Sequence, residues 1–145
     1  MKGMLVVAML LAAPAARADD TWAAWGPMLG NFVAEGATYS LEPALDGKVL
    51  VRKGQSGKHA DLMVVYAEGR KTRADYWDNE GHVIRYEVTL AGSQAVFLAG
   101  PRADAPGFRF TVDFTDRDNL GMTFEIAPPG GAFKTYLSGK MSRKR

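Results

Sequence analysis

Two segments flanking the turn Asn79-Glu80-Gly81 carry most of the polar chemistry of this chain. The charged residues are Arg73, Asp75 and Asp78 before the turn, and Arg85 and Glu87 after it. An arginine and a carboxylate inside a protein could hold a ligand carboxylate or transfer a proton. On the outside, the same side chains would form ordinary cross-strand ion pairs worth about 0.2–1 kcal/mol each. We expect the outward arrangement, and the inward one remains the basis of an enzymatic alternative.

Tyrosines on separate segments offer an apolar ring with a polar tip, which suits a ligand pocket and a protein core equally well. Methionine adds flexible apolar surface that can adapt to a bound molecule. The predicted ligand-binding residues are Tyr66, Tyr76, Arg85, Tyr86, Met122 and Tyr136. No catalytic residue is assigned, because no serine lies in a nucleophile elbow and no glycine loop has a phosphate-binding sequence.

The two histidines, His59 and His82, have no second nitrogen ligand at i+2 or i+4, and the acidic residues are scattered. We therefore predict no metal site. The chain has no cysteine, which excludes thiol catalysis, cysteine-bound zinc and iron–sulfur clusters. An exported protein without disulfides relies on its core alone, which is typical of a bacterial periplasm or the medium.

Apolar residues recur at every second position through most of the chain, as where Ile84, Tyr86 and Val88 alternate with Arg85 and Glu87. This period is that of a half-buried β-strand. The predicted strands are 31–35, 38–42, 48–53, 62–68, 72–78, 82–90, 94–99, 108–114, 120–126 and 133–141. Many short strands separated by glycine, proline and asparagine turns are typical of a closed antiparallel barrel.

We therefore predict an all-β fold, a single antiparallel barrel of about ten strands that can enclose a small molecule. The apolar faces are expected to point inward. The inward residues are Ile84, Tyr86, Val88, Phe110, Val112, Leu120, Met122 and Phe124. The glycine- and serine-containing stretch 55–60 is expected to be a mobile loop that gates one end.

A short helical segment is predicted before the first strand. Trp22, Trp25 and Leu29 are spaced to share one helix face, and Pro27 is expected to divide the segment into two turns. The tryptophans are expected to close one end of the barrel as part of its core.

The first eighteen residues have the features of a secretory signal peptide. Lys2 precedes an apolar run at 4–13, and Ala16-Arg17-Ala18 has the small-x-small pattern of a cleavage site. The run is too short to span a hydrocarbon core of about 30 Å. We predict a signal peptide at 1–18 and one exported domain at 19–145, in the periplasm or medium and without stable membrane insertion.

Removal of residues 1–18 takes away two basic residues and no acidic one, so the formal net charge falls from +2 to zero. A neutral domain has no electrostatic preference for nucleic acid, and we predict no such partner. The basic end of the chain, with Lys140, Arg143, Lys144 and Arg145, is expected to be a solvated terminus. Contact of this end with an anionic surface is the alternative.

The segment Leu29-Gly30-Asn31-Phe32-Val33-Ala34-Glu35-Gly36 resembles the opening of the calycin superfamily. The stretches 45–52, 76–84 and 133–139 are similar to uncharacterised bacterial domains of lipocalin-like shape. The resemblance implies a lipocalin-like barrel and the binding of a small ligand. Some calycin-like barrels hold haem through a single histidine, so the resemblance makes His59 or His82 a candidate axial ligand, although no cofactor is expected.

Three hypotheses follow. The first is an exported, monomeric barrel that binds a small apolar or amphipathic molecule in its interior. The second is a barrel enzyme of the lyase or isomerase type that uses an Arg/carboxylate/Tyr set. The third is a packed β-domain that acts through its surface. Two observations distinguish the three hypotheses: whether the interior is open or filled, and which charged groups point into it.

Overall fold

The computed structural model describes residues 21–145, so the predicted signal peptide lies outside the described residues. One 3₁₀-helix precedes ten strands. The elements are η1 (Ala23–Met28), β1 (Gly30–Ala34), β2 (Ala37–Ala44), β3 (Val49–Ser56), β4 (His59–Glu68), β5 (Lys71–Asp78), β6 (Val83–Ala91), β7 (Gln94–Ala99), β8 (Gly107–Asp113), β9 (Asn119–Ala127) and β10 (Lys134–Arg143). Within this part of the chain, no helix is both long and apolar enough to cross a bilayer.

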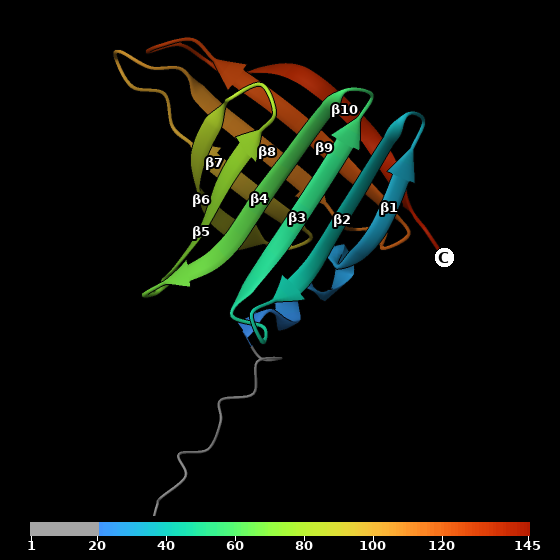
Figure 1. Ribbon diagram of the computed structural model, residues 1–145. Helices are drawn as coiled ribbons and strands as arrows, with labels where there is room; N and C mark the ends of the chain where they lie inside the picture. Colours follow the sequence, from blue (N-terminus) through green and yellow to red (C-terminus); the bar gives the residue numbers. More distant parts are fainter. Residues whose placement is uncertain (1–20) are drawn as a thin grey trace, which may run out of the picture.

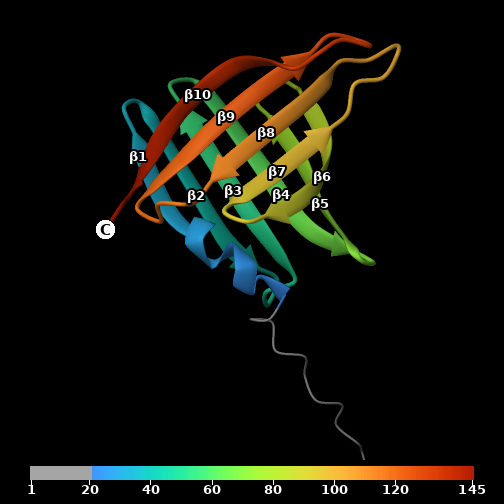
Figure 2. The same cartoon turned by 180° about the vertical axis from the view of Figure 1, so that it is seen from behind.

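The ten strands form one closed antiparallel barrel (Figures 1 and 2). Each strand pairs with the next along the chain, and β1 pairs with β10 to close the ring. The predicted fold class is confirmed, and each predicted strand corresponds to an observed one. The predicted loop at 55–60 is wrong. β3 continues to Ser56 and β4 begins at His59, so that only Gly57 and Lys58 form the turn, with a φ of 59° at Gly57.

The eight residues predicted to face inward lie on the inner face of the sheet. Ile84, Tyr86, Val88, Val112 and Leu120 are buried in the core. The other three are Phe110, Met122 and Phe124, of which the first two pack against that core. The ladder pairs Phe124 with Phe110 and so places both on the same face.

The helix η1 closes one end of the barrel, which we call the closed end (Figure 1). Trp22, Trp25 and Met28 are buried at every third position, as expected for the three residues per turn of a 3₁₀-helix. The prediction of Leu29 as the third residue of this stripe was therefore wrong, and Pro27 lies inside one continuous helix. The ring of Trp25 meets Phe97 edge-on at 6.0 Å between centroids.

The two strands that close the barrel differ in length. β1 has five residues and β10 has ten, and their ladder pairs Phe32 with Arg143 and Val33 with Ser142. One further backbone hydrogen bond runs from the N–H of Lys144 to Asn31 O at 2.8 Å. The rest of β10 extends beyond β1 towards the opposite end of the barrel, which we call the open end. A β-bulge interrupts the pairing with β9 there, and Tyr136 and Leu137 are 73% and 67% exposed.

Arg143 holds this closure together. Its Nη1 donates to Leu29 O at 2.7 Å and its Nη2 donates to Pro27 O at 2.8 Å. The guanidinium also lies 4.5 Å from the centre of the Phe32 ring. A side chain at Gly30 would meet Arg143 Nη1 at 2.9 Å, and its φ of +116° also favours glycine. Arg143 is thus part of the barrel and not of a solvated terminus.

Candidate functional site

Arg52 on β3 points into the barrel, on the same face as buried Leu50. Its guanidinium lies 5.0 Å from the centre of the Tyr39 ring and 5.5 Å from that of Phe110. Phe110 is on β8, five positions from β3 in the ring of ten strands, and therefore on the opposite wall. Arg52 thus reaches across the interior, with the filled core of the closed end on one side and the open end on the other.

Asp61 on β4 accepts a hydrogen bond from Nη1 of Arg52. Gly54 lies directly opposite Asp61 on β3, and a Cβ atom at Gly54 would stand 2.7 Å from the carboxylate oxygen Oδ2. Glycine at this position gives the carboxylate the space to lean towards Arg52. The Nε atom of Arg52 is buried and has no hydrogen-bond partner among residues 21–145.

Polar groups continue from Asp61 towards the open end, and we call Arg52, Asp61, His59, Tyr76 and Asp78 the polar strip. His59 Nε2 lies 3.6 Å from Asp61 Oδ2 and 3.4 Å from the hydroxyl of Tyr76. The Tyr76 hydroxyl donates to Asp78 Oδ2 at 3.3 Å. The strip therefore connects the middle of the barrel to its rim along β3, β4 and β5.

Burial sets the protonation of the tyrosines in the interior. It raises the pKa of Tyr39 to about 12, with Arg52 opposing the rise and Asp61 adding to it. Burial also raises the pKa of Tyr76 and Tyr86, and the nearby Asp61 carboxylate adds to both shifts. All three hydroxyls therefore keep their protons at neutral pH and can donate a hydrogen bond as well as accept one.

Aromatic side chains line the wall opposite the polar strip. Phe108 and Phe124 stack with their rings 6.1 Å apart and nearly parallel, at 5°. These two residues and Phe110 are only half-buried, although their register points them inward. Solvent therefore reaches inward-facing rings near the open end. One polar and one aromatic wall together suit a molecule that has a polar group and an apolar body.

The predicted ligand-binding residues divide between the two faces of the sheet. Tyr76, Tyr86 and Met122 are inside the barrel. Tyr66 and Arg85 are outside, where the Tyr66 hydroxyl and Arg85 Nη1 both bond to Asp75 Oδ2, at 3.3 and 3.1 Å. Tyr136 is exposed at the β10 bulge. The structure thus brings three of the six together inside the barrel, while the Tyr136 ring meets Phe124 of the aromatic wall edge-on at 6.2 Å between centroids.

The charged pairs between β5 and β6 lie outside, as we expected. The same expectation was wrong for Asp78, whose side chain is only 4% exposed and accepts from the inward Tyr76 hydroxyl. The ladder pairs Arg73 with Glu87 and Asp75 with Arg85, and the Arg73 Nη1–Glu87 Oε2 distance is 3.5 Å. Arg52, Asp61 and Asp78 are inward charged groups, of which the sequence prediction missed the first two. The available signal for Arg52 was that it shares the parity of the apolar Leu50, two residues before it on the same strand.

Both histidines lie beside carboxylates at the open end, and haem ligation by either of them stays a prediction. Both ring nitrogens of His59 lie within 4 Å of groups of its own chain, with Nδ1 3.9 Å from Glu80 Oε2. His82 Nδ1 lies 2.8 Å from Asp78 Oδ2 at the rim, and the ring is exposed. Burial would raise the pKa of Asp78, but the donors of His82 and Glu80 outweigh it and lower the pKa below its usual value.

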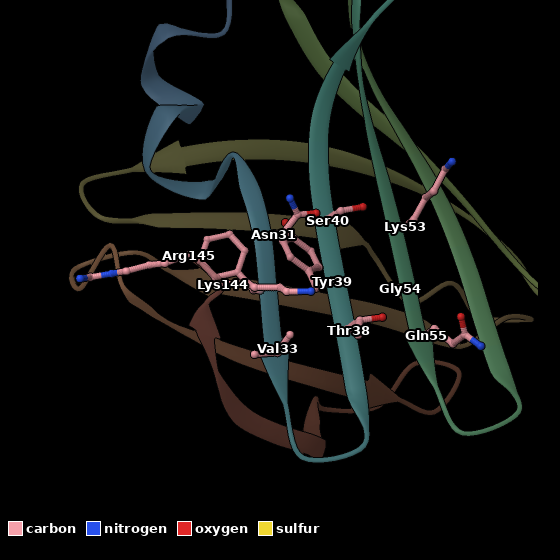
Figure 3. A pocket seen from close by; sticks show the side chains of 11 residues that line it. Asn31, Val33, Thr38, Tyr39, Ser40, Lys53, Gly54, Gln55, Lys144 and Arg145 are labelled. Atoms are coloured by element: carbon pink, nitrogen blue, oxygen red, sulfur yellow. The ribbon is translucent and has the colours of Figure 1, made fainter.

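A shallow groove of about 570 Å³ lies on the other side of β1 to β3 and is separate from the polar strip. Figure 3 shows its lining side chains coming from these three strands and from the C-terminal end. Most of them belong to the outer face of the sheet, and the charged ones are Lys53, Lys144 and Arg145. The groove is wide and open. In the interior, by contrast, the side chains of Arg52 and Asp61 are only 14% and 10% exposed.

No protein-family model matches the chain, and no curated protein matches it. The resemblance to lipocalin-like domains therefore stays a prediction, and the function has to be argued from the site itself.

Proposed function

We propose that this protein binds a small amphipathic molecule in the part of the barrel interior that lies between Arg52 and the open end. One observation carries the proposal. The Nε–H of Arg52 is buried between two aromatic rings and has no hydrogen-bond partner among the described residues. A buried donor without a partner costs about 1–3 kcal/mol, and an acceptor atom of a ligand would remove that cost.

The charge of the interior indicates which polar group the ligand carries. Arg52 is neutralised by Asp61, which is within hydrogen-bond distance. A further full negative charge on the ligand would meet Asp61 at close range. The arrangement is therefore better suited to a neutral acceptor, such as a carbonyl, ester or hydroxyl oxygen, with the apolar part of the ligand against Phe108 and Phe124.

We propose also that the protein acts after export, as a monomer in the periplasm or medium. The support is the Ala16-Arg17-Ala18 motif after a short apolar run, and the absence of cysteine. Intact-mass measurement on exported protein tests this part. A chain that begins at Asp19 supports it, and an exported chain that keeps residues 1–18 contradicts it.

The binding test uses an environment-sensitive fluorescent probe with an apolar body and a neutral acceptor group. Arg52→Met removes the donor at similar side-chain length, and Arg85→Met makes the same change on the outer face. Met122→Trp replaces one neutral side chain with a larger one and so fills interior space without altering the charge. Met122 faces Gly139 across the ladder, so its ladder partner there has no side chain. Circular dichroism confirms that each variant is folded.

We expect saturable binding by the wild type and by Arg85→Met. Binding by Arg52→Met should be at least about tenfold weaker, which corresponds to about 1.4 kcal/mol. Met122→Trp should also bind more weakly. No saturable binding by the wild type would contradict the proposal, and so would equal affinity of Arg52→Met and Arg85→Met.

The position of His59 favours a barrel lyase or isomerase as the second candidate. Its Nε2 lies near both the Tyr76 hydroxyl and the Asp61 carboxylate, and these are groups that can exchange protons with a bound molecule. The test is to incubate small molecules extracted from the cell envelope with the wild type and with His59→Gln. A product formed by the wild type alone, and seen by mass spectrometry, would support an enzyme.

A further inference from the structure

We infer that the rim of the open end binds a divalent transition-metal ion through His59, Asp78, Glu80 and His82, which we call the rim cluster. This site goes beyond the interior binding proposed above, since it takes a different class of ligand and uses two residues, Glu80 and His82, that the interior does not. Its members come from the start of β4, the end of β5 and the turn that leads to β6.

The distances between the side chains are those of a coordination shell. One ligand atom each from His59, Asp78 and Glu80 lies within 4.8 Å of the others. Glu80 Oε2 is 3.9 Å from His59 Nδ1 and 3.7 Å from His82 Nδ1. Two ligands of a tetrahedral ion with bonds of about 2.0–2.2 Å stand about 3.3–3.6 Å apart, so small side-chain rotations bring these atoms into place.

The backbone around the rim cluster is held firmly. Asp78 has a side chain that is only 4% exposed, and its Oδ1 accepts the backbone N–H groups of Glu80 and His82 at 3.0 and 2.9 Å. Its Oδ2 lies 2.8 Å from His82 Nδ1 and also accepts the hydroxyl of Tyr76. Gly81, at a φ of 92°, permits the sharp turn that returns His82 towards Asp78.

A second set of bonds fixes this turn to the neighbouring hairpin. The Asn79 side chain donates to Lys58 O at 2.7 Å and accepts from the backbone N–H of Ala60 at 3.1 Å. The backbone N–H of Asn79 donates to Ala60 O at 3.0 Å. These contacts set the position of His59 relative to Asp78. Such support from outside the ligand shell is what orients ligands before an ion binds.

The ligand chemistry selects the class of ion. The chain has two histidines, and both belong to the rim cluster. Two imidazoles and two carboxylates suit Zn²⁺ and related first-row ions, whereas Mg²⁺ and Ca²⁺ prefer shells made of oxygen alone. Two carboxylates also balance the charge of one divalent ion when both imidazoles are neutral.

Metal titration of the protein, produced without a histidine tag and stripped with a chelator, tests the inference. Co²⁺ reports coordination through its visible absorption, and Zn²⁺ binding is measured by calorimetry. The ligand variants are His59→Asn, Glu80→Gln and His82→Asn. Glu68→Gln is the matched control, because Glu68 and Glu80 side chains are both 63% exposed and Glu68 is at the closed end.

We expect one Zn²⁺ per chain and a Co²⁺ spectrum that Zn²⁺, but not excess Mg²⁺, displaces. Each ligand variant should weaken Zn²⁺ binding at least about tenfold, and Glu68→Gln should leave it unchanged. Met122→Trp should also leave it unchanged, because β9 lies across the ring from β4, and this separates the metal site from the interior one. The inference is overturned if the wild type shows no one-to-one binding, or if either histidine variant or Glu80→Gln binds Zn²⁺ as the wild type does.

Discussion

Replacing Arg143 with alanine removes the side chain that connects β10 to the segment before β1, where the sheet closes into a ring. Its guanidinium donates to Leu29 O, Pro27 O and Arg117 O and covers the ring of Phe32. Alanine would leave the two carbonyls next to β1 without these donors. The substitution therefore tests whether the short pairing between β1 and β10 depends on this residue.

The expected loss of stability follows from these contacts. A hydrogen bond from a charged donor contributes about 1.5–3 kcal/mol when buried, and we take about 1 kcal/mol for each of the two short bonds because the side chain is 25% exposed. The contact with Phe32 adds about 0.5–1 kcal/mol. The ion pair with Asp118, at 3.8 Å, is largely exposed and adds little. Arg143→Ala should therefore lower the free energy of unfolding by about 3 kcal/mol.

Urea denaturation followed by tryptophan fluorescence measures this change, and Arg145→Ala is the matched control. Arg145 has the same charge two residues further on and is 86% exposed, so its loss should change stability by less than about 0.5 kcal/mol. Arg143→Lys keeps the charge but not the planar fork, and it should recover less than half of the loss. Equal stabilities of the two alanine variants would refute the assignment of Arg143 to the barrel closure.

Two further predictions concern single contacts in the wall. The hydrogen bonds from Arg109 lower the pKa of Glu125. The stabilisation by this pair is therefore complete above the unfolded-state pKa of about 4.3. It is lost as pH falls through the lower folded-state pKa. Glu125→Gln should flatten the decline of stability below about pH 5 in denaturation series, and an unchanged profile would contradict this. Gly54→Ala should destabilise by about 1–3 kcal/mol in thermal melts, because the new Cβ displaces Asp61, whereas Gly139→Ala meets nothing within 4 Å and should not. Equal effects at the two glycines would refute the steric argument.

The strands were predictable because their signal is local. Residues such as Ile84 and Tyr86 alternate with charged neighbours, and this pattern needs no knowledge of the rest of the chain. The prediction of a loop at 55–60 was wrong for the same reason, because a local run of small polar residues does not show whether they pair in a hairpin. His59 was therefore assigned to a loop, although it lies on the inner face of β4.

The candidate site was less predictable because it depends on residues from distant strands. Arg52 and Phe110 meet only after the sheet has curved into a ring. A charged residue on an apolar face also breaks the alternation from which faces are read. His59 and His82 are 23 positions apart, which is why the sequence alone predicts no metal site. They approach the same carboxylate of Glu80 only through a turn that Asp78 organises.

The limited pairing between β1 and β10 has a consequence for how the barrel folds. Every other ladder joins strands that are neighbours in the chain, so each can form as a local hairpin. The closure alone brings together residues more than 100 positions apart, such as Phe32 and Arg143, and therefore carries the largest loop-closure entropy. We expect the ring to close last on the folding pathway and to open first in the native state. Because opening there separates β1 from β10 and leaves the hairpins intact, the same step gives a molecule a lateral path to the interior without unfolding of the barrel.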